Sequence, residues 1–169
     1  GRGGGGDGGR GGGARGGDRA GPRVVWGWGG GGAGRGGSLQ RGCLGRLADH
    51  GGALSRPWGA EARDLFVELL AYGPAAVPVI EDLDHVGLFV LLLPEWEPCR
   101  SRPQRNAYHR FTVDRHLMEA AAEASRLVDR VDRPDLLLVG ALLHDIGKGY
   151  PGDHTEVGVD LVRTISSRM

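Results

Sequence analysis

The sequence has only two cysteines and no long apolar run. Cys43 and Cys99 lie far apart, without a metal-binding or redox motif around either, which favours reduced, non-catalytic thiols over a disulfide or a zinc site. No stretch of about 18 apolar residues occurs, and the N-terminus lacks the apolar core of a signal peptide. The sequence therefore predicts a cytoplasmic protein with no membrane span.

The sequence also lacks an overall charge, but its charges are unevenly distributed. The formal net charge is zero over 169 residues. Residues 1–37 hold 21 of the 33 glycines and carry six arginines against two aspartates, a net charge of +4, which leaves −4 for residues 38–169. A segment so rich in glycine and so poor in apolar residues cannot form a core. We therefore expect residues 1–40 to be a disordered Gly/Arg-rich leader.

Nucleic-acid binding is one alternative function for this leader. Its arginines could contact phosphates, and Trp26 and Trp28 could stack on bases. However, its glycine blocks vary in length and no aromatic-flanked unit is repeated. A flexible leader, or translation of GC-rich DNA outside its reading frame, explains the same composition. Nucleic-acid binding through the leader is therefore the less favoured alternative.

From residue 58 onward, apolar residues recur at helical spacing, and no strand pattern competes with them. The fold class is therefore predicted to be all-α. Residues 97–110, rich in Arg and Pro, predict an extended surface loop. The expected helices are residues 59–73 closing at Gly73 and Pro74, a segment from after Pro78 to Leu93 with a break at Gly87, residues 112–133, residues 135–146, and residues 155–169.

The helix expected at residues 135–146 is apolar nearly all round, which predicts burial, yet it ends in His144 and Asp145. An unpaired buried carboxylate costs several kcal/mol, whereas a bound metal ion satisfies both side chains. Consecutive helical residues point about 100° apart, so both can face one site only where the helix ends, and Gly147 supplies that end. His116, on the preceding antiparallel helix, is the natural third ligand, because packed helices lie roughly 8–10 Å apart.

A histidine on one helix followed by His-Asp on the next resembles the pattern of the HD-domain family of metal-dependent phosphohydrolases. Two longer segments, LLPEWEPCRSRPQRNAYHRFTVDRHLMEAAAEA and LLLVGALLHDIGKGYPGDHTEVG, resemble the HD region of the bacterial bifunctional PII uridylyltransferase/uridylyl-removing enzymes. The likeness covers roughly residues 58–165. The fold it implies is part of a helical HD-domain bundle.

The resemblance implies that His116, His144 and Asp145 ligate a divalent ion, Mn²⁺ or Mg²⁺. Such an ion lowers the pKa of a bound water toward about 7. The implied reaction removes uridylyl groups, or adenylyl groups in actinobacterial relatives, from the PII nitrogen-regulatory protein. Lys148 and His154 are the candidate catalytic residues, through contact with phosphate or a second metal. A solvated lysine and a simple helix cap are the alternatives for these two.

The resemblance also sets the expected domains. These are the leader at 1–40, a linker and helical segment at 41–107, and the N-terminal part of an HD domain at 108–169. The family's nucleotidyltransferase and ACT domains, and the distant aspartate that completes the HD site, have no counterpart in this sequence. We therefore expect a fragment that binds Mn²⁺ weakly and reacts slowly. A fragment with no activity of its own is the other alternative.

Overall fold

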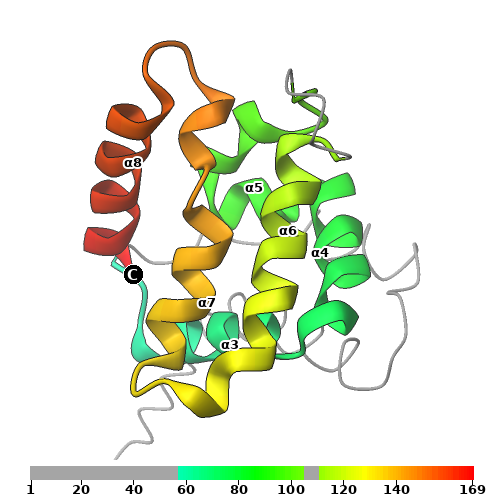
Figure 1. Cartoon of the computed structure of the whole chain (residues 1–169), viewed down its shortest axis with the longest axis vertical. Coiled ribbons are helices and arrows are strands. Elements are labelled where there is room, and N and C mark those ends of the chain that lie inside the picture. The colour runs from blue at the N-terminus through cyan, green and yellow to red at the C-terminus, as the bar shows by residue number, and fades with distance from the viewer. Residues whose placement is uncertain (1–56, 105–110) are drawn as a thin grey trace, which may run out of the picture.

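The computed structural model describes residues 57–104 and 111–169, and these are helical without any β-strand. The predicted all-α class is therefore confirmed. The leader and Cys43 lie outside the described ranges. The elements, drawn in Figure 1, are α3 (Ala60–Ala71), η1 (Gly73–Ala75), α4 (Ala76–His85), α5 (Leu88–Leu92), η2 (Pro94–Cys99), α6 (Val113–Ala124), η3 (Ser125–Arg130), α7 (Pro134–Leu143), η4 (Ile146–Gly149) and α8 (His154–Arg168), where η marks a 3-10 helix.

The first two predicted helices are present, with one boundary corrected. α3 buries Phe66 and Leu69 as expected and ends before Gly73, whose φ of 61° lies in the left-handed region. α4 begins at Ala76, so the prediction that this segment starts after Pro78 is wrong. Proline is tolerated in a first turn, because the N–H that it lacks has no partner there. Gly87, with a φ of 76°, separates α4 from α5 as predicted.

The prediction that residues 97–110 form an extended surface loop is wrong for the first residues of that range. Residues 94–99 form the 3-10 helix η2, and the side chains of Trp96 and Cys99 are completely buried. Trp96 meets Phe89 edge to face, with ring centroids 5.0 Å apart. A short 3-10 helix gives no apolar periodicity, so the sequence offered no signal for this burial. Residues 105–110 lie outside the described part of the chain.

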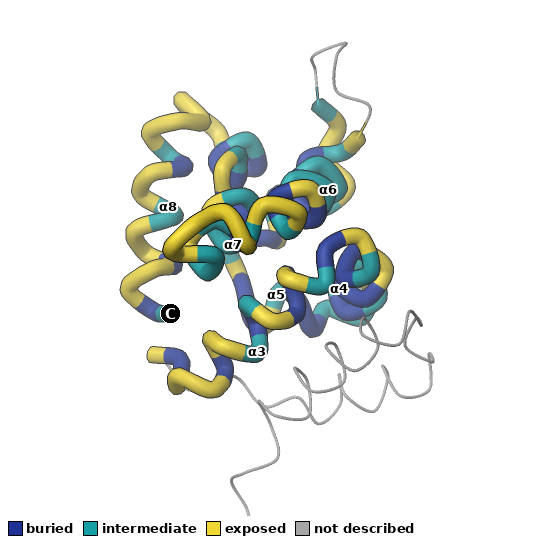
Figure 2. Tube along the Cα trace, turned by 60° about the horizontal axis from the view of Figure 1, so that its bottom comes forward, coloured by how far each residue is buried: buried dark blue, intermediate teal, exposed yellow. Residues whose placement is uncertain are grey.

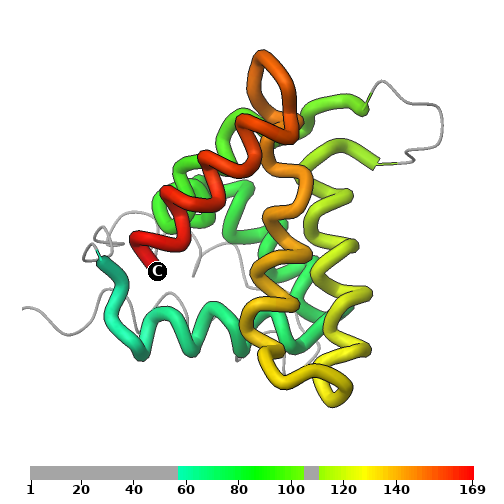
Figure 3. The backbone as a smooth tube through the Cα atoms, turned by 60° about the vertical axis from the view of Figure 1, so that its left-hand side comes forward, coloured from blue at the N-terminus to red at the C-terminus, as the bar shows by residue number. Residues whose placement is uncertain are grey.

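α6 and α7 run antiparallel side by side, and both are shorter than predicted (Figures 1 and 3). α6 ends at Ala124, and the 3-10 helix η3 begins at the next residue. Val131 was expected on the apolar face of this helix, but its side chain is exposed. α7 ends at Leu143 instead of near Ile146. It is not buried all round either, because the Leu136 side chain is 59% exposed. Composition alone predicted burial on every side, but the helices around α7 cover only part of its surface.

α8 was correctly predicted and is anchored at both ends. At its start, the Asp153 carboxylate accepts hydrogen bonds from the backbone N–H groups of Thr155 and Glu156, at 2.8 and 3.2 Å. At its other end, Arg168 forms two 2.7 Å hydrogen bonds with the Glu95 carboxylate. The outer side of α8 is exposed (Figure 2). The helix therefore packs along one side of the bundle without being enclosed.

One apolar core joins α3 through α8, with members from Trp58 to Ile165. It includes residues from both sides of the predicted domain boundary at 107/108. That boundary falls in residues 105–110, so the division remains a prediction. None of the helices in residues 57–104 and 111–169 combines the length and the apolar character needed to cross a membrane.

Candidate metal centre

His116, His144 and Asp145 meet where the start of α6 lies beside the end of α7. The two imidazole Nε2 atoms are 3.2 Å apart. Asp145 Oδ2 lies 3.4 Å from Nε2 of His116 and 3.3 Å from Nε2 of His144. Within the described ranges, these residues form the group of His, Cys, Asp or Glu side chains whose donor atoms converge closely enough to hold a metal ion. We call them the His-Asp cluster.

The end of α7 explains how consecutive residues can share one site. His144 still has helical backbone angles, but Asp145, with φ of −119° and ψ of 18°, has left the helix. The chain therefore turns between the two side chains. The prediction that Gly147 supplies this helix end is wrong. Instead, Gly147 is needed for packing, because a Cβ at that position would overlap the backbone oxygen of His154 in α8.

The tautomer of His144 follows from its second nitrogen. His144 Nδ1 lies 2.8 Å from the backbone oxygen of Ala141 in the last turn of α7. A carbonyl oxygen can only accept, so Nδ1 carries the proton and donates it there. In the neutral ring, the lone pair is then on Nε2, the atom directed at His116 and Asp145. This arrangement, with one ring nitrogen fixed by a carbonyl, is typical of metal-binding histidines.

The spacing of the donor atoms fits a single ion. Ligands about 2.1 Å from a metal, at tetrahedral or octahedral angles to one another, are separated by roughly 3.0–3.4 Å. The observed separations of 3.2, 3.3 and 3.4 Å lie within this range. Two imidazoles and a carboxylate also form a facial set that leaves room for further ligands. The residues present therefore fit a divalent cation.

Charge balance at the cluster depends on Lys148. Burial by itself raises the pKa of Asp145, but the hydrogen bond from Lys148 and the charge of its ammonium group lower that pKa overall. Lys148 Nζ lies 2.6 Å from Asp145 Oδ2. Asp145 is therefore held as an anion although its side chain is only 18% exposed. Of the two predicted catalytic residues, Lys148 is thus in contact with the cluster.

His154, the other predicted catalytic residue, is not among the converging donors. It is the first residue of α8 and its side chain is exposed. The capping alternative does not apply to its side chain, because Asp153 caps the helix. Aspartate followed three residues later by Glu156 is a recognisable start of a helix, so this cap could have been read from the sequence. A catalytic role for His154 remains a prediction.

Sequence reasoning did not identify Gln104, which contacts Lys148 beside the cluster. Its side-chain oxygen lies 3.4 Å from Lys148 Nζ. Gln104 belongs to a segment without helical periodicity, 44 positions before Lys148. No local pattern links two residues at that separation, so only the folded chain reveals the contact.

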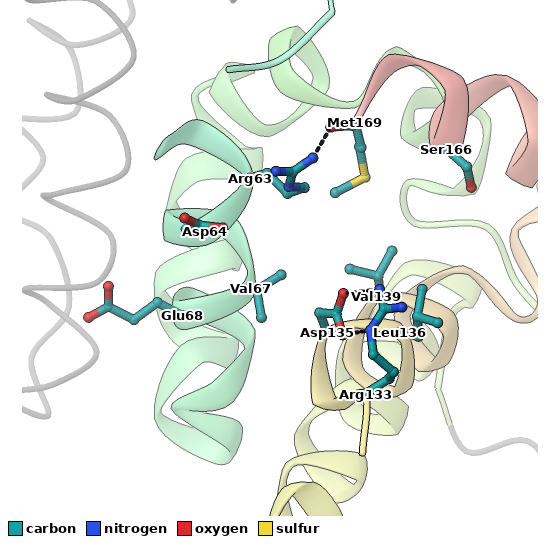
Figure 4. Close-up of a pocket in the computed structure, with 10 residues that line it drawn as sticks. All are labelled: Arg63, Asp64, Val67, Glu68, Arg133, Asp135, Leu136, Val139, Ser166 and Met169. Atoms are coloured by element: carbon teal, nitrogen blue, oxygen red, sulfur yellow. Dashed lines mark hydrogen bonds and ion pairs between the residues drawn. The ribbon is translucent and has the colours of Figure 1, made fainter. Parts of the chain in front are cut away.

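A separate cavity of about 700 Å³ lies between α3, the first half of α7 and the end of α8 (Figure 4). Val67, Leu136, Val139 and Met169 contribute apolar surface to it, and charged side chains and Ser166 complete its lining. The cavity shares no residue with the His-Asp cluster. Its α7 residues come from the opposite end of that helix, so the candidate chemistry lies elsewhere.

Comparison with known proteins gives consistent matches. Residues 113–169 match the family model described as the HD domain. The chain is 52% identical, over 131 residues, to a bifunctional uridylyltransferase/uridylyl-removing enzyme of Streptomyces coelicolor, which covers 78% of this chain and 16% of that protein. Enzymes of the same name from Mycobacterium tuberculosis and Corynebacterium glutamicum are 50% and 37% identical over 126 and 116 residues, covering 75% and 69% of this chain and 16% and 17% of theirs. The chain thus spans about a sixth of the length of these relatives. No solved structure matches it.

Proposed function

Residues 113–169 belong to the HD-domain family, and from this premise we propose that the described part of the chain is a metal-dependent phosphodiester hydrolase region. The proposed reaction removes uridylyl or adenylyl groups from the PII nitrogen-regulatory protein. It rests on the HD match, on relatives whose name includes a uridylyl-removing activity, and on the His-Asp cluster.

The observation that carries the proposal is the convergence of three donor atoms from the start of α6 and the end of α7. Nε2 of His116, Nε2 of His144 and Oδ2 of Asp145 are mutually 3.2–3.4 Å apart. A packed or solvated histidine needs no such partner set. The carbonyl of Ala141 supports a ligand role for His144, because it directs the Nε2 lone pair toward the other two donors.

In the proposed reaction, His116, His144 and Asp145 hold a divalent cation, with Mn²⁺ better suited than Mg²⁺ to two imidazole ligands. When bound, the cation supplies Lewis-acid activation of water and withdraws negative charge from the phosphoryl group. Lys148 contributes a fixed positive charge beside the cluster, where it can stabilise a phosphoryl oxygen. The Ala141 carbonyl keeps His144 in one tautomer. His154 remains a candidate for contact with the nucleotidyl phosphate.

The test is release of UMP or AMP from nucleotidylated PII, using the full 169-residue chain with Mn²⁺. We expect His144→Ala to slow release at least 100-fold, because the variant loses one of three ligands. His85→Ala, at the exposed end of α4, is the matched control and should retain the wild-type rate. Equal rates for wild type and His144→Ala would contradict the proposal. The absolute rate also tests the sequence-based expectation of slow turnover.

A further inference from the structure

Lys148 occupies an unusual position relative to the His-Asp cluster. Its ammonium Nζ lies 2.6 Å from Asp145 Oδ2. That same oxygen lies 3.3 and 3.4 Å from the two imidazole Nε2 atoms. An ammonium that only oriented the carboxylate could do so through Oδ1, leaving Oδ2 to the cluster. Here the positive charge instead lies on the oxygen that the other donors face.

Gln104 holds Lys148 from a second direction. Its Oε1 lies 3.4 Å from Nζ, a long contact, and its Nε2 is buried without a hydrogen-bond partner. The reverse orientation of the amide would direct an NH₂ donor at an ammonium, which has no lone pair to accept it. The carbonyl oxygen of Gln104 therefore faces Lys148, at the expense of a buried donor. Polar groups left unsatisfied in this way are rare and need an explanation.

The segment that carries Gln104 is itself firmly attached. Ser101 donates its backbone N–H to the Asp114 carboxylate at 2.7 Å, and Val113 donates its own to the backbone oxygen of Arg102 at 2.8 Å. Ser101 has a φ of 49°, a left-handed conformation that is unfavourable for a residue other than glycine. A strained backbone persists only where surrounding contacts determine it. The backbone shortly before Gln104 is therefore anchored to the start of α6.

We infer that Gln104 is a positioning residue that holds the Lys148 ammonium on Asp145 Oδ2, where the ammonium competes with a divalent cation for the ligand oxygen. The inference rests on the proposed function, because it needs the His-Asp cluster to bind a cation. Two positive charges at one carboxylate oxygen repel each other strongly in a half-buried site. A contact that keeps the Lys148 ammonium on Asp145 Oδ2 therefore weakens cation binding. Loss of that contact strengthens cation binding.

The test measures the Kd for Mn²⁺ alone by electron paramagnetic resonance, using the full chain. Lys148→Met removes the competing charge and should tighten binding by at least about tenfold. Gln104→Met keeps the side-chain length but removes the second acceptor, and should tighten binding by about threefold, since one partly exposed polar contact is lost. In the Lys148→Met background, Gln104→Met should have no further effect, because its influence passes through the ammonium. Gln104→Glu should also tighten binding, by drawing the ammonium away from Asp145.

The outcomes separate this inference from the proposed function. If the wild type binds no Mn²⁺, or if His144→Ala binds as well as the wild type, both fail together. If the wild type binds and His144→Ala does not, the metal centre stands. In that case, unchanged or weaker binding by Gln104→Met and Gln104→Glu overturns the inference alone. An equal effect of Gln104→Met with and without Lys148 also overturns it, since a merely structural role would not depend on the lysine. Circular dichroism melts of every variant show whether the helices remain folded.

Discussion

An aspartate lies beside a positive side chain at each end of α7, Asp135 in its first turn and Asp145 just after its last, but the surroundings of the two aspartates differ. At the first turn, Asp135 receives hydrogen bonds from Nε and Nη2 of Arg133 at 2.9 and 2.7 Å. The Arg133 hydrogen bonds lower the pKa of Asp135 to about 2. A helix N-terminus favours a carboxylate, so this surface pair is complete without any further partner.

At the other end, Asp145 follows the last turn of α7, where the helix dipole disfavours a carboxylate. Lys148 is one partner, but two imidazole Nε2 atoms also face the same oxygen. In the tautomer fixed by Ala141, the His144 lone pair points at an anion, which is repulsive unless a positive charge lies between them. The comparison therefore separates a simple ion pair on the surface from a group of donor atoms whose spacing fits a cation.

The largest difference between the two ends should appear in cation binding. Asp145→Asn replaces the anionic ligand of the cluster by a neutral amide, so we expect its Kd for Mn²⁺ to rise at least about 100-fold. Asp135→Asn, the matched substitution at the first turn, should leave the Kd unchanged. Isothermal titration calorimetry measures both. Comparable losses in the two variants would show that the aspartates act only through net charge.

The second largest effect concerns stability, where Gly147 in η4 and Gly140 in α7 differ in the space around them. A Cβ on Gly147 would overlap the His154 backbone oxygen and lie 2.8 Å from the backbone nitrogen of Gly158. Gly147→Ala should therefore lower the free energy of unfolding by about 3 kcal/mol or more, since backbone cannot move as easily as a side chain. Gly140→Ala is the control within α7, because a Cβ there meets nothing within 4 Å. It should raise stability by about 0.5–1 kcal/mol. Urea denaturation curves measure both, and a stable Gly147→Ala would refute the close approach of η4 and α8.

The smallest effect is the acid dependence of stability at the first turn. Asp135 has a pKa lowered from 3.8 to about 2. A lowered folded-state pKa contributes stability above the unfolded value, and this contribution is lost as pH falls from 3.8 toward about 2. Asp135→Asn should therefore be less stable than wild type near pH 6, and the difference should shrink below pH 3. Thermal melts across this range measure it. A difference that is constant with pH would exclude the Arg133 pair as its source.

Sequence reasoning identified the His-Asp cluster because the residue types of its members and their order along the chain indicate a metal site. His116 and the adjacent pair His144 and Asp145 stand on segments whose helical character is clear from apolar spacing, and the short connection makes those helices antiparallel neighbours. Gly73 and Gly87 likewise marked helix ends correctly, since both adopt left-handed backbone angles. Local patterns were therefore sufficient to locate these two helix ends.

The remaining features depend on contacts between distant segments. The burial of Trp96 and Cys99 depends on the fold, because the sulfur of Cys99 contacts the Ile146 carbonyl 47 positions away. The contact between Gln104 and Lys148 arises in the same way. Gly147 was interpreted as a helix end, whereas its small size is required by α8. Single-sequence patterns contain no information about contacts between distant segments, so the sequence could not predict these features.

The central claim is that the end of α7 and the start of α6 together bind one divalent cation. Anomalous diffraction at the manganese edge, from crystals of the chain soaked in Mn²⁺, tests it most directly. We predict a single strong peak about 2.1–2.3 Å from Nε2 of His116, Nε2 of His144 and Oδ2 of Asp145. Absence of a peak there at saturating Mn²⁺, or a peak beside Asp135 at the first turn of α7 instead, would contradict it.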